Sequence, residues 1–291
     1  MTTPLRTLSD YALALESLYL QASALPLPGA EPLFLPASSH VDAPTALIFS
    51  PHPDDEVIIG GWPLRLLRQC GWRVINVAVT LGSNPSRKMP RLEELQQCCK
   101  RIGFGLVVAD EVGLDRVNLG ARREEPERWS HSVSVIVSIL RDLKPKAIFY
   151  PHSSDYNTTH IGVNALINHA LLRMEESFEC SAVETEFWAP MECPNLLVES
   201  TATDVGMLLQ ALACHVGEIQ RNPYHLRVPA WMSDNVRRGA ELVGGQGGSA
   251  PEFIFGTLYR LRRWRNHKIE EVLPRGEFLT AGKDPATLLL G

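Results

Sequence analysis

The chain has 291 residues, of which 45% are hydrophobic and 21% charged, a composition typical of a folded globular protein rather than a disordered one. Its formal net charge of −5 provides no overall basic surface of the kind that binds nucleic acid. No apolar run reaches the roughly 20 residues that cross a bilayer, and the six cysteines lack the spacing of a disulfide scaffold. We therefore expect a cytoplasmic protein with no membrane span and no nucleic-acid partner.

The chain begins with an apolar stretch, "LSDYALALESLYLQASALPLPG", over residues 8–29. Asp10 and Glu16 interrupt what would be the core of a signal peptide, so the pattern favours an amphipathic helix. We assign residues 1–42 to an N-terminal helical extension and residues 43–291 to a single α/β domain.

From residue 43 onward, short β-branched runs alternate with helical periodicities, which is typical of a parallel sheet covered by helices on both faces. The predicted strands lie at 44–50, 73–82, 105–109 and 146–152, and the predicted helices at 61–71, 89–102, 127–143 and from 160 to about 176. Further along, 183–190 and 195–200 indicate strands and 204–219 indicates one helix. This alternation predicts a doubly wound, mostly parallel sheet, whose ligand site lies beyond the carboxyl ends of the strands.

Unusual polar residues follow two of these strands. His52, Asp54, Asp55 and Glu56 come directly after the first strand, and a second polar cluster follows the fourth. If the two strands are neighbours, their loops converge on one place. Acidic residues after a strand can simply cap a helix, but capping does not explain a histidine between two prolines.

Imidazole and carboxylate groups together can bind zinc, and a catalytic zinc site uses three protein ligands and keeps one position open. His52 and Asp55 are three residues apart on a constrained turn and supply two ligands, and His160 supplies the third. Asp54 is then the spare carboxylate that a hydrolase needs as its general base. We therefore expect Zn²⁺ at this site, although another divalent metal would suit the same ligands.

At these residues the sequence resembles the PIG-L/LmbE-like zinc-dependent de-N-acetylases, which remove an acetyl group from substrates of the N-acetylglucosamine type. "PHPDDEVIIGG" is similar to the family's HPDDE signature, and "RLEELQQCCKRIG", "LLQALACHVGEI" and "APEFIF" resemble later segments. The resemblance implies a Rossmann-like fold, with His52, Asp55 and His160 as metal ligands and Asp54 as the base. It also implies Arg91 as a substrate contact, although a solvated helix charge is an equal interpretation.

The sequence departs from the family in its second motif, "DYNTTH". Asn157 stands where the family has a histidine that stabilises the oxyanion, and Thr159 stands where it has an aspartate. An asparagine amide can donate a hydrogen bond to an oxyanion, so we predict this role for Asn157, assisted by His152 or His215. Each of these two histidines could equally be structural.

Two groups of residues complete the predicted site. Asp155, together with Arg91, is a candidate for substrate binding. Trp188, Trp231 and Tyr224 are candidates for stacking on a sugar, although large aromatic side chains more often pack in a core.

We therefore predict an enzyme: a zinc-dependent de-N-acetylase in which zinc-bound water attacks the acetamide of an N-acetylglucosamine-type conjugate. The alternative is a domain that binds a metal or glycan without catalysis, because its second motif is altered. A nucleotide-binding enzyme is disfavoured, since no G-x-G-x-x-G follows the first strand. The expected partner is a small-molecule or glycoconjugate amino sugar, and a homo-oligomer is compatible with the sequence.

Overall fold

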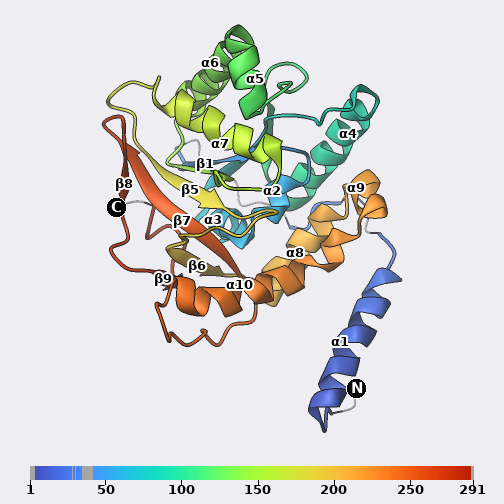
Figure 1. The fold of residues 1–291 in the computed structure, drawn as a ribbon. Helices are drawn as coiled ribbons and strands as arrows, with labels where there is room; N and C mark the ends of the chain where they lie inside the picture. Colours follow the sequence, from blue (N-terminus) through green and yellow to red (C-terminus); the bar gives the residue numbers. More distant parts are fainter. Residues whose placement is uncertain (1–3, 28, 30, 35–41, 290–291) are drawn as a thin grey trace.

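A nine-stranded sheet lies between two layers of helices in the computed structural model, which describes residues 4–27, 29, 31–34 and 42–289 (Figure 1). Along the sheet the strands follow the order β3-β2-β1-β4-β5-β7-β6-β9, and β8 pairs with β7. The strands are β1 (Thr45–Ser50), β2 (Arg73–Ala78), β3 (Gly105–Val108), β4 (Ala147–Pro151), β5 (Cys180–Thr185), β6 (Leu196–Glu199), β7 (Gly256–Arg265), β8 (Lys268–Glu271) and β9 (Glu277–Leu279).

The strands from β3 to β5 are parallel, whereas β7 runs antiparallel to both β5 and β6. Strand β1 lies between β2 and β4, so the chain reverses its direction of winding there. This is a topological switch point, at which the loops after β1 and β4 come together. The predicted mostly parallel α/β sheet is confirmed.

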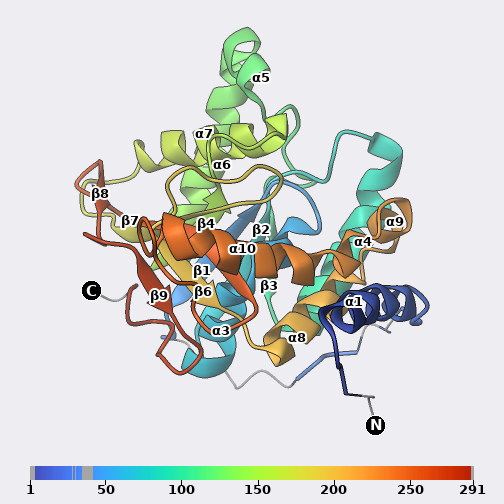
Figure 2. The same ribbon diagram turned by 60° about the horizontal axis from the view of Figure 1, so that its bottom comes forward.

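Alternate residues of β1 face the two helical layers, as the period of a strand requires. Ala46 and Ile48 pack in the core beneath α3 (Gly61–Cys70), α4 (Pro85–Ile102) and α8 (Ala202–Leu212). Leu47 and Phe49 pack beneath α6 (Pro126–Leu143) and α7 (Thr158–Leu171) on the opposite face (Figures 1 and 2). The remaining short or peripheral helices are α2 (Asp55–Ile58), α5 (Leu119–Glu124), α9 (Val216–Arg221), the 3-10 turn η1 (Tyr224–Leu226) and α10 (Val228–Leu242).

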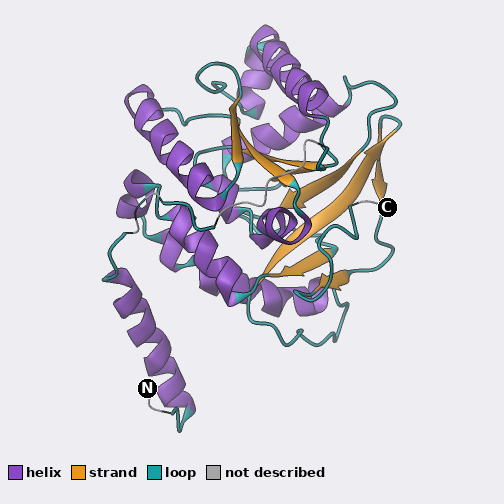
Figure 3. Ribbon diagram, turned by 180° about the vertical axis from the view of Figure 1, so that it is seen from behind, coloured by secondary structure: helices purple, strands orange, loops and turns teal. Residues whose placement is uncertain are grey.

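Helix α1 (Leu8–Ser23) projects from the body of the molecule, as Figure 3 shows from behind. It begins with a capping box between Thr7 and Asp10, and none of its residues is buried. The Arg227 guanidinium lies 4.2 Å from the centre of the Tyr19 ring, which joins α1 to the segment next to η1. The expected N-terminal helix is present; residues 1–3, 28, 30 and 35–41 of the predicted extension lie outside the described residues.

The structure differs from the prediction in several elements, among them the strand expected over 183–190, which is β5 at Cys180–Thr185. The single helix expected over 204–219 is broken into α8 and α9, and His215 lies at the corner between them. The helix expected from residue 160 begins at Thr158, because the Asn157 side chain caps it, and it ends at Leu171. We predicted no strand at β7, which is the longest of the described strands.

The glycines after the acidic motif are required by close packing. Gly60 has a φ of +98°, and a Cβ at this position would collide with Thr257 on β7. The segment "PHPDDEVIIGG" is therefore held against the sheet just after its charged residues, so these cannot move away into solvent.

Candidate metal centre and active site

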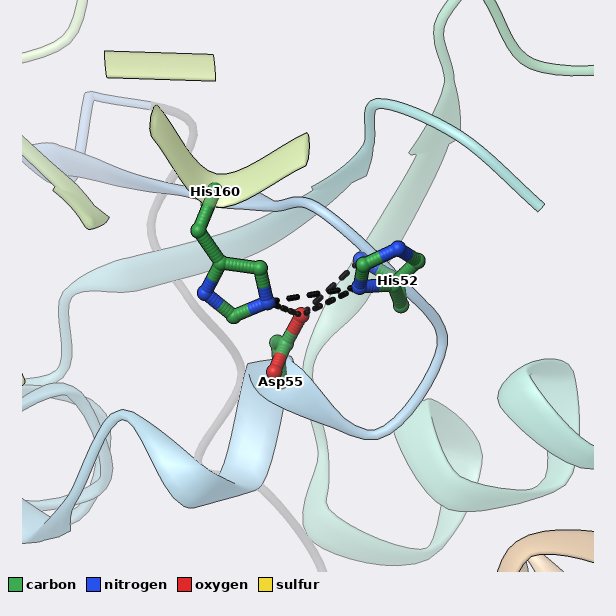
Figure 4. A group of neighbouring side chains, drawn as sticks. All are labelled: His52, Asp55 and His160. Atoms are coloured by element: carbon green, nitrogen blue, oxygen red, sulfur yellow. Dashed lines mark hydrogen bonds and ion pairs between the residues drawn. The ribbon is translucent and has the colours of Figure 1, made fainter. Parts of the chain in front are cut away.

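Three potential ligand side chains converge at the switch point between β1 and β4 (Figure 4). His52 and Asp55 come from the loop after β1 and the start of α2, and His160 comes from the first turn of α7. Nδ1 of His52 lies 3.3 Å from Nε2 of His160, and Oδ2 of Asp55 lies 3.5 and 3.3 Å from these two nitrogens. The sequence prediction that the two loops meet is confirmed.

These donor atoms fit a metal ion. In a tetrahedral zinc site with bonds of about 2.0–2.1 Å, two ligand atoms lie roughly 3.3–3.4 Å apart, which matches the three observed separations. Two imidazole nitrogens face each other, and Oδ1 of Asp55 is buried without a hydrogen-bond partner among the described residues. Although burial opposes it, the neighbouring His160 and His52 hold the pKa of Asp55 below its ordinary value. The residues therefore suit a borderline cation such as zinc.

The His160 ring is packed among buried groups on the side of Nδ1. The ring is fully buried and packs edge-on against Phe187, with the ring centres 4.8 Å apart. Oδ2 of Asp155 lies 3.8 Å from Nδ1 of His160, and the same carboxylate accepts hydrogen bonds from the backbone N–H groups of Asn157 and Trp188. Asp155 thus lies behind His160, a position from which a carboxylate can orient a ligand histidine, and its predicted substrate contact stays a prediction.

Asp54 lies at the start of α2 in an unusual backbone conformation, with φ of 117° and ψ of −30°. Its side chain is only 10% exposed, and Oδ2 accepts a hydrogen bond of 2.5 Å from the Tyr224 hydroxyl. Its backbone N–H donates to the Glu56 carboxylate. Burial, followed by the charge of Asp55, raises the pKa of Asp54 to about 8. Asp54 is thus a buried carboxyl of raised proton affinity beside the candidate metal ligands.

Arg91 on α4 reaches the same loop. Its guanidinium donates to the carbonyl oxygen of Pro53 and lies 4.0 Å from Oδ2 of Asp54, while its Nε lies 3.5 Å from a carboxylate oxygen of Glu218. Gly82, opposite, leaves room for the guanidinium, because a Cβ there would meet it. Arg91 is therefore placed at the site and held there, which excludes the interpretation as a freely solvated charge.

The two other polar residues after β4 are engaged with the backbone. Oδ1 of Asn157 accepts from the Thr159 N–H as the cap of α7, which leaves its amide NH₂ as the group able to donate. His152 is buried, with Nε2 at 3.0 Å from the carbonyl oxygen of Ala189 and Nδ1 accepting from the Ser154 N–H. Because both ring nitrogens are used, the geometry favours the structural interpretation of His152.

His215 does not join the three ligands either. Its side chain is fully buried, and Nε2 lies 2.6 Å from Oε1 of Glu56. Although burial opposes it, the Glu56 carboxylate raises the pKa of His215. His215 thus contacts Glu56 rather than the candidate metal ligands, and its predicted assistance to the oxyanion stays a prediction.

A cavity of about 550 Å³ opens beside the ligands, with His52 and Thr159 in its wall. Its charged lining residues are Lys88, Asp115, Arg116 and Arg128. The Lys88 ammonium pairs with Asp115 at 2.6 Å. The cavity is thus polar, with basic and acidic groups both present in its lining.

Aromatic residues flank the loop after β1 on another side. The rings of Trp188 and Tyr224 meet edge to face with centres 6.2 Å apart, and Trp188 is 46% exposed. Trp231 instead packs against the core. The contact of Tyr224 with Asp54 could not be expected from spacing, because 170 residues separate them.

The fold and site together define an α/β protein with a candidate His-Asp-His metal centre at the switch point of its sheet. Residues 47–171, which contain all three candidate ligands, match the model of the PIG-L family, described as GlcNAc-PI de-N-acetylase. The resemblance to the PIG-L family that was noted in the sequence is therefore confirmed over residues 47–171.

Solved structures share the fold at low sequence identity. The N,N'-diacetylchitobiose deacetylase of Pyrococcus horikoshii is 16% identical, with a TM-score of 0.54 over 89% of this chain and 94% of that one. The 4-carboxy-2-hydroxymuconate hydratase GalB of Pseudomonas putida is also 16% identical, with a TM-score of 0.53 over 75% and 95%. A zinc-inhibited form of teicoplanin deacetylase is 13% identical, with a TM-score of 0.53 over 74% and 96%.

No curated protein matches the sequence. None of the described helices has the length and apolar character needed to cross a membrane.

Proposed function

We propose that the protein is a zinc-dependent de-N-acetylase that hydrolyses the acetamide of an N-acetylglucosamine-type conjugate, and that residues 43–291 form its single catalytic domain. The observation that carries this proposal is Asp54, a buried carboxyl that lies beside three converging metal ligands without belonging to them. A site that only bound a metal would need no such group. The PIG-L family match and the deacetylases of similar fold support the same reaction.

His52, Asp55 and His160 would hold the metal, which when bound polarises the amide carbonyl and lowers the pKa of water. Asp54 accepts a proton from the attacking water at a carboxylate oxygen. Once the C–N bond breaks, the protonated Asp54 gives this proton to the leaving amine nitrogen. The Tyr224 hydroxyl holds Oδ2 of Asp54, which leaves the other carboxylate oxygen to carry the proton.

Asn157 is our candidate for an additional donor to the oxyanion. The cap contact orients its amide, because Oδ1 faces the Thr159 N–H and the NH₂ group is directed elsewhere. An amide donor stabilises a developing negative charge less strongly than a charged imidazolium would, so turnover is expected to rely more on the metal ligands.

The polar cavity next to His52 is the proposed place for the sugar. Hydroxyl groups of a sugar can donate to Asp115 and accept from Lys88 or Arg128, and Arg91 lies on the Asp54 side. Exposed Trp188 offers a ring face for stacking near Tyr224.

The test is acetate release by the zinc-loaded protein from a panel of N-acetylhexosamine conjugates, with Asp54→Asn as the matched control. Asp54→Asn keeps the size of the side chain but cannot take up the proton. The proposal predicts acetate release that the variant loses, with zinc still bound to both proteins. Stoichiometric zinc binding without release from any conjugate would favour the alternative, a domain that binds without turnover.

A further inference from the structure

Glu56, Cys98 and His215 form a second group of potential ligands behind the candidate metal centre. Their donor atoms lie within 4.8 Å of one another, and all three side chains are fully buried. The separation between Oε1 of Glu56 and Nε2 of His215 is 2.6 Å, which is a hydrogen bond, whereas two ligands of one zinc ion lie roughly 3.3 Å apart. Burial also raises the pKa of Cys98, which opposes the thiolate form. This group is therefore a hydrogen-bonded cluster rather than a second metal site.

The Glu56 carboxylate joins two parts of the chain that are far apart in sequence. One oxygen pairs with His215, and the other accepts a 2.8 Å hydrogen bond from the backbone N–H of Asp54. A buried carboxylate with partners on both oxygens is costly to remove, because each partner would lose its own hydrogen bond in a site without solvent.

The Asp54 backbone needs such a restraint. Its φ of 117° lies in a region that residues with a Cβ rarely adopt, and such a conformation persists only where the surroundings determine it. The Glu56 carboxylate is the acceptor for the backbone N–H of Asp54, so its loss would remove one restraint on this conformation.

His215 ties this restraint to the segment that covers Asp54 from the other side. It lies at the corner where α8 ends and α9 begins, and its backbone carbonyl accepts from the N–H of Glu218 in the first turn of α9. The same segment continues to Tyr224, whose hydroxyl contacts the Asp54 carboxylate. The backbone and the side chain of Asp54 are thus both fixed by elements that meet at His215.

We propose that Glu56 and His215 form a buried clamp that positions the general base, Asp54, by holding its strained backbone and anchoring the α8–α9 corner. The clamp deepens the proposed deacetylase function and rests on it. Glu56 and His215 are positioning residues, because they act through Asp54 and do not touch the reacting atoms.

The experiment compares Glu56→Ala, Glu56→Gln and a control variant, Glu184→Ala. Glu184 is also a buried carboxylate with a charged partner, Arg262, but it lies on β5 away from Asp54. Four quantities are measured: zinc bound per chain, kcat and KM for acetate release, and the rate of hydrogen exchange at the Asp54 amide. The exchange measurement requires no substrate.

For Glu56→Ala we expect kcat to fall by about 10- to 100-fold with KM changed by less than about twofold, and exchange at the Asp54 amide to rise at least about tenfold. Glu56→Gln keeps an acceptor oxygen for that amide, so it should restore slow exchange and most of the turnover. Glu184→Ala should lower the melting temperature without changing kcat or the exchange rate of the Asp54 amide. Zinc binding should be unchanged in all three.

The clamp is refuted if Glu56→Ala keeps wild-type exchange at the Asp54 amide, or if its kcat falls no more than that of Glu184→Ala. Should Glu56→Ala not fold, His215→Asn breaks the pair with a smaller loss of volume and must show the same two changes. A wild-type protein that releases no acetate would contradict the proposed function, while the exchange measurement would still decide whether the clamp exists.

Discussion

Replacing Tyr224 by phenylalanine removes one hydroxyl group and with it the hydrogen bond to Oδ2 of Asp54. The bond is short, at 2.5 Å, and its acceptor belongs to a side chain that is only 10% exposed. We expect the ring to stay in place, since it packs against Trp188 and the core. The change therefore isolates the contribution of the hydroxyl to the position of Asp54.

A hydrogen bond to a charged group is worth about 1.5–3 kcal/mol, which corresponds to a roughly 10- to 150-fold decrease in kcat if the whole contribution is lost in the transition state. Water entering beside the exposed Trp188 ring can replace the hydroxyl in part, which favours the lower end of this range. KM should change little, because Tyr224 acts on Asp54 rather than on the bound sugar.

The assay is the steady-state rate of acetate release by Tyr224→Phe and by Tyr150→Phe as the matched control. Tyr150 is buried in the core beneath α6 and α7, so losing its hydroxyl should leave kcat unchanged. A Tyr224→Phe protein with wild-type kcat would show that this hydrogen bond does not matter for turnover. A rise in KM alone would show that Tyr224 acts on the substrate instead.

Three further predictions concern other residues. Asp155→Asn should weaken zinc binding by about 10- to 100-fold in a competition titration, since Asp155 supports His160; unchanged affinity would remove that role. Asn157→Asp keeps the cap of α7 but loses the amide donor, so kcat should fall with little change in melting temperature. Asn157→Ala also loses the cap, so it should lower both kcat and, by about 1 kcal/mol, the free energy of unfolding. Equal kcat in Asn157→Asp and wild type would exclude the oxyanion role. Burial lowers the pKa of His169, whose Nδ1 accepts a hydrogen bond from the Trp129 indole. The His169 imidazole therefore binds a proton more readily in the unfolded chain than in the folded one, so the free energy of unfolding should decline as the pH falls below about 6.5. Urea unfolding of wild type and His169→Gln should show a difference in free energy that shrinks between about pH 8 and pH 5, and a constant difference would contradict this.

The sheet and the three candidate metal ligands were predictable from the sequence because they depend on local patterns. β-branched runs and the turn "HPDDE" are contiguous, and the parallel topology alone brings the loops after β1 and β4 together. His160 could be predicted as the third candidate ligand for the same reason, since it lies at the start of the helix that follows β4.

Tyr224 and His215 were candidates for the site, but their contacts with Asp54 and Glu56 were not predictable, because they join distant segments. The corner between α8 and α9, which positions His215, is hidden in the sequence by a continuous helical periodicity. Likewise, Asp155 is close in sequence to other candidate site residues, and only the structure shows that its carboxylate faces His160. Strand β7 was missed because its basic residues obscure the alternation that marks a half-buried strand.

The most direct test of the account is a zinc titration of metal-stripped protein in which bound zinc and acetate release are followed in the same sample. The account predicts that turnover rises in proportion to zinc and saturates at one ion per chain, and that His160→Ala binds no zinc in this range and releases no acetate. Acetate release that persists after the metal has been removed, or one zinc per chain still bound tightly by His160→Ala, would contradict it.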